Sequence, residues 1–199
     1  MAATISAKDV SALRGRTGTG MMDCKKALQE TDGDIEKAVE LLRTKGIAKA
    51  EKRAGRQASE GVIGSYVHFN GKVAVLVELN SETDFVARTD DFKQLAKDIA
   101  MHIASANPLA VNAEDVPADV VERERAIFDA QVAESGKPEQ VRPKIVEGKL
   151  KKYFKENVLM EQPFVKDDKK TIADVVGEVT AKLGENLVVR RFVRYELGT

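Results

Sequence analysis

Few side chains in this chain of 199 residues have the type and spacing that covalent catalysis or metal binding requires. Its two histidines lie far apart in the sequence, His68 in an expected strand and His102 in an expected helix, and neither belongs to a ligand spacing such as HExxH. A histidine outside any cluster is usually structural, and we expect that role for both. Cys24, the only cysteine, falls on the apolar side of an expected helix, where a thiol is usually buried and unreactive. The sequence therefore predicts no catalytic residue, no metal site and no cofactor.

The stretch Gly15-Arg-Thr-Gly-Thr-Gly20 has the glycine content of a phosphate-binding loop, which would imply nucleotide chemistry. Such a loop follows a strand, whereas this stretch follows an expected helix. Met21 and Met22 also stand where the loop needs Lys and then Ser or Thr. We therefore reject the phosphate-loop interpretation, and we expect that the protein is not an enzyme.

The most informative side chains lie in Asn80-Ser-Glu-Thr-Asp-Phe-Val-Ala-Arg88, between an apolar hairpin and a periodic helix. Ser81 followed three residues later by Asp84 resembles a short capping box, which predicts one helical turn. Phe85 would then stand beside the Asp84 carboxylate at a surface connection. One aromatic beside one acid suits entry into another protein. The alternative, equally open on this pattern, is that Phe85 packs into the local core.

Residues 1–47 predict a compact three-helix module. Ser6 with Asp9 three positions on marks the start of the first helix, and the glycine-rich stretch is expected to interrupt it. A third helix would begin with Asp34 as its N-cap and end at Gly46.

The second helix of this module carries two adjacent methionines with different expected roles. Met21, Cys24 and Leu28 share one stripe of the helix and are expected in the core. Met22 falls on the polar side instead. An exposed methionine suits an adaptable protein-binding surface, although a single exposed apolar residue is also common.

Residues 48–60 mix small residues with charge and lack apolar periodicity, so they predict a solvated linker. The core domain, residues 61–199, opens with strands over 62–69 and 72–79. These strands flank Asn70-Gly71, the usual signal of a type I′ hairpin turn.

The rest of the core predicts helices and one more strand. A helix begins near Thr89, with its apolar stripe running from Phe92 to Ile103. The remaining elements are expected as helices over 117–134 and 138–160, a helix from Thr171 to Gly184 and a strand from Leu187 to Glu196. The fold class is therefore α+β, with an antiparallel three-stranded sheet packed with helices.

Composition narrows the class of protein further. The chain is 43% hydrophobic and 32% charged, which describes a soluble globular protein. It has no apolar run long enough for a membrane span and no signal-peptide pattern at its start, so we expect a cytoplasmic protein. A net charge of +0 argues against a general nucleic-acid binder.

Seven blocks of the sequence, taken together and in order, match one family. The N-terminal blocks are Leu13-Arg14, Thr17-Gly-Thr-Gly-Met-Met-Asp-Cys-Lys-Lys-Ala-Leu28 and Gly33-Asp-Ile-Glu-Lys-Ala38. The later blocks are Thr83-Asp-Phe-Val86, Glu161-Gln-Pro-Phe-Val-Lys-Asp167, Gly184-Glu-Asn186 and Arg190-Arg-Phe192. In residues and in order these blocks resemble bacterial elongation factor Ts, and the resemblance covers the whole chain.

The resemblance implies a function and a partner. Members of the family are guanine-nucleotide exchange factors for elongation factor Tu, the GTPase that delivers aminoacyl-tRNA to the ribosome. The expected partner is elongation factor Tu, both GDP-bound and nucleotide-free, with no direct nucleic-acid or membrane contact. The N-terminal module would have a ubiquitin-associated-like fold and dock on the GTPase domain through Leu13, Met21 and Met22.

The turn after the hairpin matches the part of the family that disturbs the nucleotide site. By matching positions, Asp84 and Phe85 would enter between two helices of the GTPase domain near its magnesium site. Thr83 and Val86 would hold the turn that presents them. The core sheet and its helices would rest on another domain of elongation factor Tu.

The chain also departs from parts of the family. Longer members carry a coiled-coil insertion and an extra C-terminal module, and 199 residues leave no room for the full set. By analogy with short members, we expect a homodimer or a two-plus-two complex with the GTPase, with the final strand near the contact. The disulfide that joins some short dimers lies near the C-terminus, a position that Cys24 does not match.

Two rival functions are compatible with parts of the sequence. An RNA- or ribosome-binding protein would use the basic linker and the lysine face of the helix over 138–160, but neutral charge and a lack of stacking aromatics oppose it. A ubiquitin-like adaptor would use the three-helix module alone and leave the Thr-Asp-Phe turn without a role.

Overall fold

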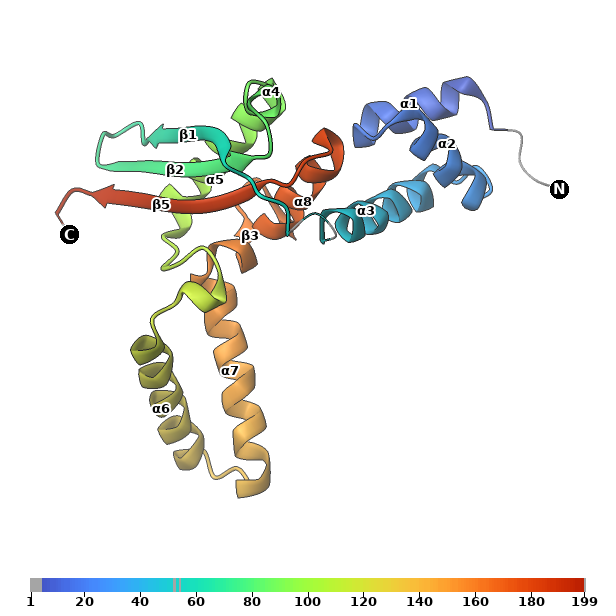
Figure 1. Ribbon diagram of the computed structural model, residues 1–199. Helices are drawn as coiled ribbons and strands as arrows, with labels where there is room; N and C mark the ends of the chain where they lie inside the picture. The colour runs from blue at the N-terminus through green and yellow to red at the C-terminus, as the bar shows by residue number, and fades with distance from the viewer. Residues whose placement is uncertain (1–4, 52, 54, 199) are drawn as a thin grey trace. The chain divides into compact units, whose positions relative to one another are not determined.

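The strands and helices of this protein form an α+β fold, as predicted (Figure 1). The computed structural model describes residues 5–51, 53 and 55–198. Contacts divide the chain into two compact units. One comprises Met1–Val62, Leu79–Leu95 and Asp174–Val188, and the other comprises Ile63–Glu78, Ala96–Ala173 and Val189–Thr199. The boundaries predicted at residues 47 and 60 follow a different division and stay predictions.

Three helices open the first unit: α1 (Ala7–Thr17), α2 (Met21–Glu30) and α3 (Ile35–Glu51). The predicted start of α1 is confirmed, because Ser6 and Asp9 form a reciprocal capping box. The glycine-rich stretch ends this helix as predicted, but not at its first glycine, Gly15, which lies inside the helix. The helix continues to Thr17 and ends at Gly18, whose φ of 66° is left-handed. Glycine lacks a Cβ and adopts this conformation without strain.

The predicted end of α3 at Gly46 is also wrong, because the helix runs on to Glu51. A Cβ built on Gly46 would lie 3.1 Å from the Cβ of Ala181 in α8 (Ile172–Leu183). The glycine therefore permits a close helix-to-helix approach instead of ending the helix. Nearby, Arg43 forms ion pairs with Asp174 at 3.3 Å and Glu178 at 3.8 Å.

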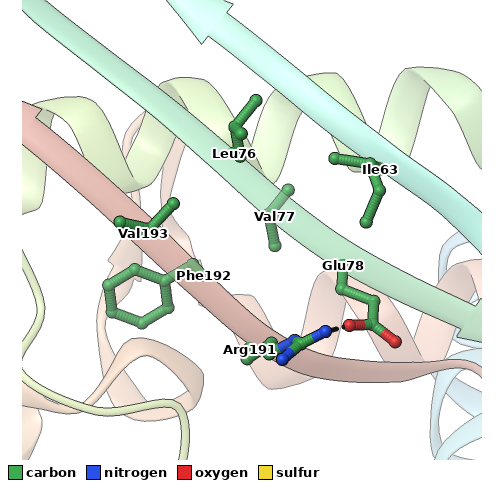
Figure 2. A pocket seen from close by; sticks show the side chains of 7 residues that line it. All are labelled: Ile63, Leu76, Val77, Glu78, Arg191, Phe192 and Val193. Atoms are coloured by element: carbon green, nitrogen blue, oxygen red, sulfur yellow. Dashed lines mark hydrogen bonds and ion pairs between the residues drawn. The ribbon is translucent and has the colours of Figure 1, made fainter.

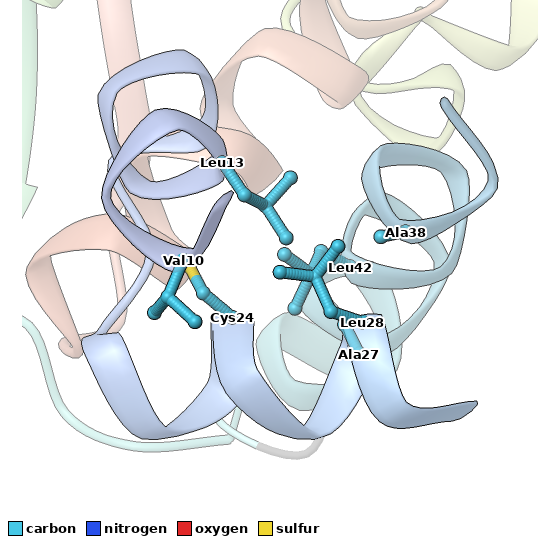
Figure 3. Packing of buried hydrophobic residues seen from close by; sticks show 7 residues of the cluster. All are labelled: Val10, Leu13, Cys24, Ala27, Leu28, Ala38 and Leu42. Atoms are coloured by element: carbon cyan, nitrogen blue, oxygen red, sulfur yellow. The ribbon is translucent and has the colours of Figure 1, made fainter. Parts of the chain in front are cut away.

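The three helices enclose a small apolar core of their own (Figure 3). Its buried members come from all three helices and are Val10, Leu13, Cys24, Ala27, Leu28, Ala38 and Leu42. The predicted burial of Cys24 and Leu28 on α2 is confirmed. Met21, predicted to join them, is instead 42% exposed at the first position of the helix.

The sheet has three strands, β1 (Glu60–Val67), β2 (Val73–Ser81) and β5 (Val188–Glu196), with β2 in the centre. The central strand of the predicted hairpin has period two, because Val75, Val77 and Leu79 are buried on one face. The edge strands are β1 and β5.

The type I′ turn predicted at Asn70-Gly71 is wrong. That turn needs positive φ at both central residues, and here Gly71 has a φ of 69° while Asn70 is not among the positive-φ residues. The Gly71 N–H donates to the His68 carbonyl, and the His68 N–H donates to the Val73 carbonyl, both at 2.8 Å. The chain thus makes a turn over 68–71 before it returns, which gives a longer loop than predicted.

Helix α4 (Asp84–Ala87) is a single turn, and α5 (Asp90–Ala106) follows it. The apolar stripe predicted for the helix after Thr89 is confirmed. Its buried members, from Phe92 onward, are Phe92, Leu95, Ala96, Ile99 and Ile103.

A helical hairpin lies between α5 and the C-terminal elements, with α6 (Ala118–Glu134) and α7 (Arg142–Asn157) side by side (Figure 1). Val132, Val146 and Leu150 form its buried core. The helix predicted over 138–160 is shorter than expected. A 3-10 turn, Glu139–Val141, precedes it, and Val158 is extended and bridges to Ala110.

A small antiparallel pair, β3 (Pro163–Phe164) and β4 (Asp167–Thr171), precedes α8 and was not predicted. Gly184, with a φ of 81°, ends α8 as predicted. Within the residues that the structure describes, no helix is long and apolar enough to cross a membrane.

Candidate functional site

The turn α4 is capped by a different residue from the one that the sequence predicted. Thr83 is the N-cap, and its hydroxyl accepts from the Val86 N–H at 3.5 Å. Ser81, the predicted cap, is fully buried at the end of β2, and its hydroxyl donates to the Thr83 carbonyl at 2.9 Å. The capping box expected from Ser81 and Asp84 is therefore wrong, because the chain is still extended at Ser81.

Phe85 points away from the protein. Its side chain is 79% exposed, so the alternative that it packs into the local core is wrong. Beside it, the Asp84 carboxylate accepts from the guanidinium of Arg88 at 2.6 Å, an ion pair across one helical turn. Ala87 is the buried member of α4, while Val86 is half-buried. The turn thus exposes one large aromatic ring next to one carboxylate.

Hydrogen bonds with residues outside α4 restrain both of its ends. At the start, the Thr83 hydroxyl donates to Glu185 Oε1 at 2.6 Å, and the Thr83 N–H donates to Glu185 Oε2 at 3.0 Å. At the end, the Thr89 hydroxyl donates to the Val86 carbonyl at 2.7 Å. Glu185 was not predicted as a site residue. The signal that could have found it is the Gly184-Glu-Asn186 block, which follows the helix but belongs to no element.

The three residues expected to dock on a GTPase domain differ in exposure. Met22 is 65% exposed on α2, which confirms that it lies outside the core, and Met21 is exposed beside it. Leu13 is 0% exposed and points between the helices of the module (Figure 3). A side chain in that position contacts no partner unless the module opens, so of these three residues the two methionines offer surface.

The histidines and the cysteine have structural surroundings. His102 is 1% exposed. Its Nε2 lies 2.9 Å from Gln162 Oε1, and its Nδ1 accepts from the Val165 N–H at 3.3 Å. This pattern assigns the proton to Nε2, and burial lowers the pKa of the imidazole. Cys24 is buried, with its thiol 3.5 Å from the Thr19 carbonyl.

His68 was expected in a strand but lies just after β1, with its Nδ1 3.0 Å from the Tyr66 hydroxyl oxygen. Among residues 5–51, 53 and 55–198, no three His, Cys, Asp or Glu side chains gather as a metal site would require. The predicted structural role of both histidines agrees with these contacts.

A second exposed surface lies on the sheet. A shallow cavity is lined by residues of all three strands: Ile63, Leu76, Val77, Glu78, Arg191, Phe192 and Val193 (Figure 2). Leu76 and Ile63 are exposed apolar side chains, and Glu78 pairs with Arg191 at 2.7 Å. The arrangement offers apolar contact area with one ion pair, which suits protein binding.

Comparison with known proteins agrees with the blocks found in the sequence. The family model described as "Elongation factor TS" matches residues 6–199. A protein of Syntrophomonas wolfei named "Elongation factor Ts" is 59% identical over 98% of this chain and 91% of its own length. Proteins of the same name from Desulfosudis oleivorans and Syntrophobacter fumaroxidans are 57% and 54% identical. These matches cover 98% of both chains in the first case and 100% of both in the second. The chain therefore belongs to the elongation factor Ts family of translation elongation factors.

Proposed function

We propose that this protein is the nucleotide exchange factor of elongation factor Tu. It binds the GDP-bound GTPase, inserts Asp84 and Phe85 near the magnesium site, and promotes the release of GDP so that GTP can bind. The observation that carries the proposal is the exposure of Phe85, 79%, on a turn restrained at both ends. Membership of the family supports the role in translation, which is carried out in the cytoplasm.

The energetics follow from linkage. If the GTPase holds GDP with nanomolar affinity, that affinity corresponds to about 12 kcal/mol, and spontaneous release is slow. A factor that weakens the binding of GDP must itself bind less tightly to the GDP form, by the same ratio. The protein therefore favours a GTPase conformation with a deformed nucleotide site, and it changes a rate without covalent chemistry.

Burial of the Phe85 ring in the GTPase accounts for part of the faster release of GDP. Burial of one Phe side chain contributes about 1.5–3 kcal/mol. Because Phe85 is exposed in the free protein, it can gain this energy when it enters the GTPase. That energy accelerates release by about one to two orders of magnitude, so other contacts supply the rest. Magnesium is the sensitive target, since it has few direct protein ligands and neutralises phosphate charge.

The other contacts come from two surfaces. Met21 and Met22 dock the N-terminal module on the GTPase domain, because flexible thioether side chains adapt to a partner surface. The exposed sheet face around Leu76 rests on another domain of the GTPase or on a second copy of this chain. The second arrangement gives a homodimer, or a two-plus-two complex with the GTPase.

Stopped-flow release of fluorescent GDP from elongation factor Tu tests the function. We expect faster release at substoichiometric amounts of this protein, because it recycles once GTP binds. A release rate that does not change with added protein would contradict the proposal.

A further inference from the structure

The segment Gly184-Glu-Asn186 has no role in the function proposed above, although it contacts the residues that precede α4. It follows α8 directly, and the positive φ of Gly184, 81°, turns the chain out of the helix. The next two residues meet the segment before α4. This meeting lies within one compact unit of the chain.

The two segments exchange hydrogen bonds in a reciprocal pattern. The carboxylate of Glu185 accepts from both the hydroxyl and the N–H of Thr83, at 2.6 and 3.0 Å. One residue away on each side, the carboxylate of Glu82 accepts from the N–H of Asn186 at 2.7 Å. Each segment thus gives one carboxylate to the backbone of the other. Hydrogen bonds to an ionised acceptor are among the stronger ones in proteins.

The second of these contacts is anchored further. Asn186 is buried, and its Nδ2 donates to the Arg56 carbonyl at 2.8 Å. The Arg56 guanidinium lies 3.6 Å from Glu82 Oε1. The contact between Glu82 and Asn186 is therefore supported by Arg56. The contact between Glu185 and Thr83 lies beside it and is the nearer of the two to Phe85 in the sequence.

The turn that carries Phe85 needs restraint from outside itself. Four helical residues are too few for a stable helix, because nucleation fixes several dihedrals for one hydrogen bond. The internal capping bond from Val86 N–H to the Thr83 hydroxyl is long, 3.5 Å. Phe85 itself is exposed and adds little packing. The two hydrogen bonds that Thr83 donates to Glu185, at 2.6 and 3.0 Å, are both shorter than this capping bond.

We propose that Glu185 is a positioning residue of the exchange site: its carboxylate fixes the N-cap Thr83 and so holds the turn in the orientation that presents Phe85. The effect of Glu185 on exchange rests on the function proposed above. Its effect on the mobility of the turn does not, so the two parts are measured separately.

The mobility of the turn is measured on the free protein. The chain contains no tryptophan, so Phe85→Trp introduces a single tryptophan, which can be excited selectively over the tyrosines, at the exposed position. We expect the time-resolved anisotropy of this variant to gain a larger nanosecond component when Glu185→Ala is added. Glu185→Gln, which keeps the size of the side chain, should have a smaller effect. Glu156→Gln, on the exposed surface of α7, removes the same charge and should have none.

The effect of Glu185 on nucleotide exchange is measured with the single variant Glu185→Ala, elongation factor Tu and labelled GDP. We expect the maximal release rate to fall about tenfold, the effect of losing a charge-assisted hydrogen bond at the site. Affinity for the nucleotide-free GTPase should fall less than the rate does, because Met21 and Met22 still bind. The melting temperature should stay close to that of the parent, and Glu156→Gln should leave every reading unchanged.

The outcomes separate the inference from the proposed function. Unchanged anisotropy in the Glu185→Ala background overturns the positioning role, whatever the GTPase assay gives. Greater mobility together with a parental release rate also overturns it. If the parent protein does not accelerate release at all, the proposed function fails, and the anisotropy alone decides whether Glu185 restrains the turn.

Discussion

The exposure of Phe85 distinguishes between two roles for its side chain, partner binding and core packing. Because its ring is exposed, Phe85→Ala should leave the melting temperature near the parental value and slow the release of GDP about tenfold or more. Asp84→Ala should act on the same step through the loss of charge at the entry point. Calorimetry and stopped-flow release on one sample measure both quantities.

Phe92→Ala is the matched control, because that ring is fully buried. It should cost about 3–5 kcal/mol of unfolding free energy as a core truncation. If Phe85→Ala lost stability to a similar extent, with unchanged exchange per folded molecule, the ring would be a packing residue.

Leu13 and Met22 should differ in their effects, whereas family positions alone imply a docking role for both. Leu13→Ala creates a cavity between α1 and its neighbours and should cost about 2–5 kcal/mol of stability. Met22→Ala should keep stability and weaken binding to nucleotide-free elongation factor Tu by about 1–2 kcal/mol. Thermal melts and titration calorimetry measure the pair. A destabilised Met22→Ala protein with parental affinity would refute this assignment.

His102 should make stability depend on pH in a definite direction. Burial lowers the pKa of its imidazole in the folded protein below the ordinary value of about 6.5. The unfolded chain therefore takes up the proton first, and the unfolding free energy falls as pH drops through about 6.5. Urea unfolding at pH 7.5 and 5.5 should show a smaller loss for His102→Gln than for the parent. Equal losses would mean that other groups carry the pH dependence.

At the scale of elements, two glycines inside helices should respond differently to the same change. Among the described residues, the methyl group of Gly15→Ala in α1 meets no atom within 4 Å, so this change should stabilise the protein by about 0.5–1 kcal/mol through helix propensity. Gly46→Ala in α3 places its methyl group 3.1 Å from the Ala181 methyl, so crowding should cancel this gain. Differential scanning calorimetry of both variants tests the comparison. A stabilised Gly46→Ala protein would show that α3 and α8 are not held at this distance.

The elements that the sequence predicted well are those whose pattern is local. The capping box at Ser6, the stripe of α5 and the stop at Gly184 depend only on near neighbours, and each is present. The prediction for Gly46 failed because a glycine that ends a helix and one that meets another helix look alike in sequence. The short strands β3 and β4 were missed because β4, Asp-Asp-Lys-Lys-Thr, has no apolar alternation.

The candidate site was predictable in part for the same reason. Phe85 and Met22 stood out because their own elements did not need them in the core. Glu185 did not stand out, since its partner Thr83 is remote in sequence and only the fold brings them together. The burial of Leu13 likewise depends on the packing of three helices, which a family motif does not report.

At the scale of the whole molecule, we expect self-association through the exposed face of the sheet. Ile63, Leu76 and Val193 are exposed apolar side chains around one cavity, and β5 is an edge strand. Sedimentation at micromolar concentration should give a dimer, or a two-plus-two complex with elongation factor Tu, and Leu76→Lys should shift it toward the monomer. A monomeric parent with a one-to-one complex would rule this out.

The helical hairpin of α6 and α7 has a consequence for engineering. It holds its own buried core of Val132, Val146 and Leu150, and its tip turns at Gly136, whose φ is 69°. A Cβ added at Gly136 would meet no atom of the described residues within 4 Å, so the tip has free space where a side chain at this position would point. A tip of this kind tolerates insertions, because added residues disturb neither core nor ladder. A fluorophore or affinity handle grafted between Ser135 and Lys137 would therefore report on the factor during translation without replacing any residue of the three proposed GTPase contacts.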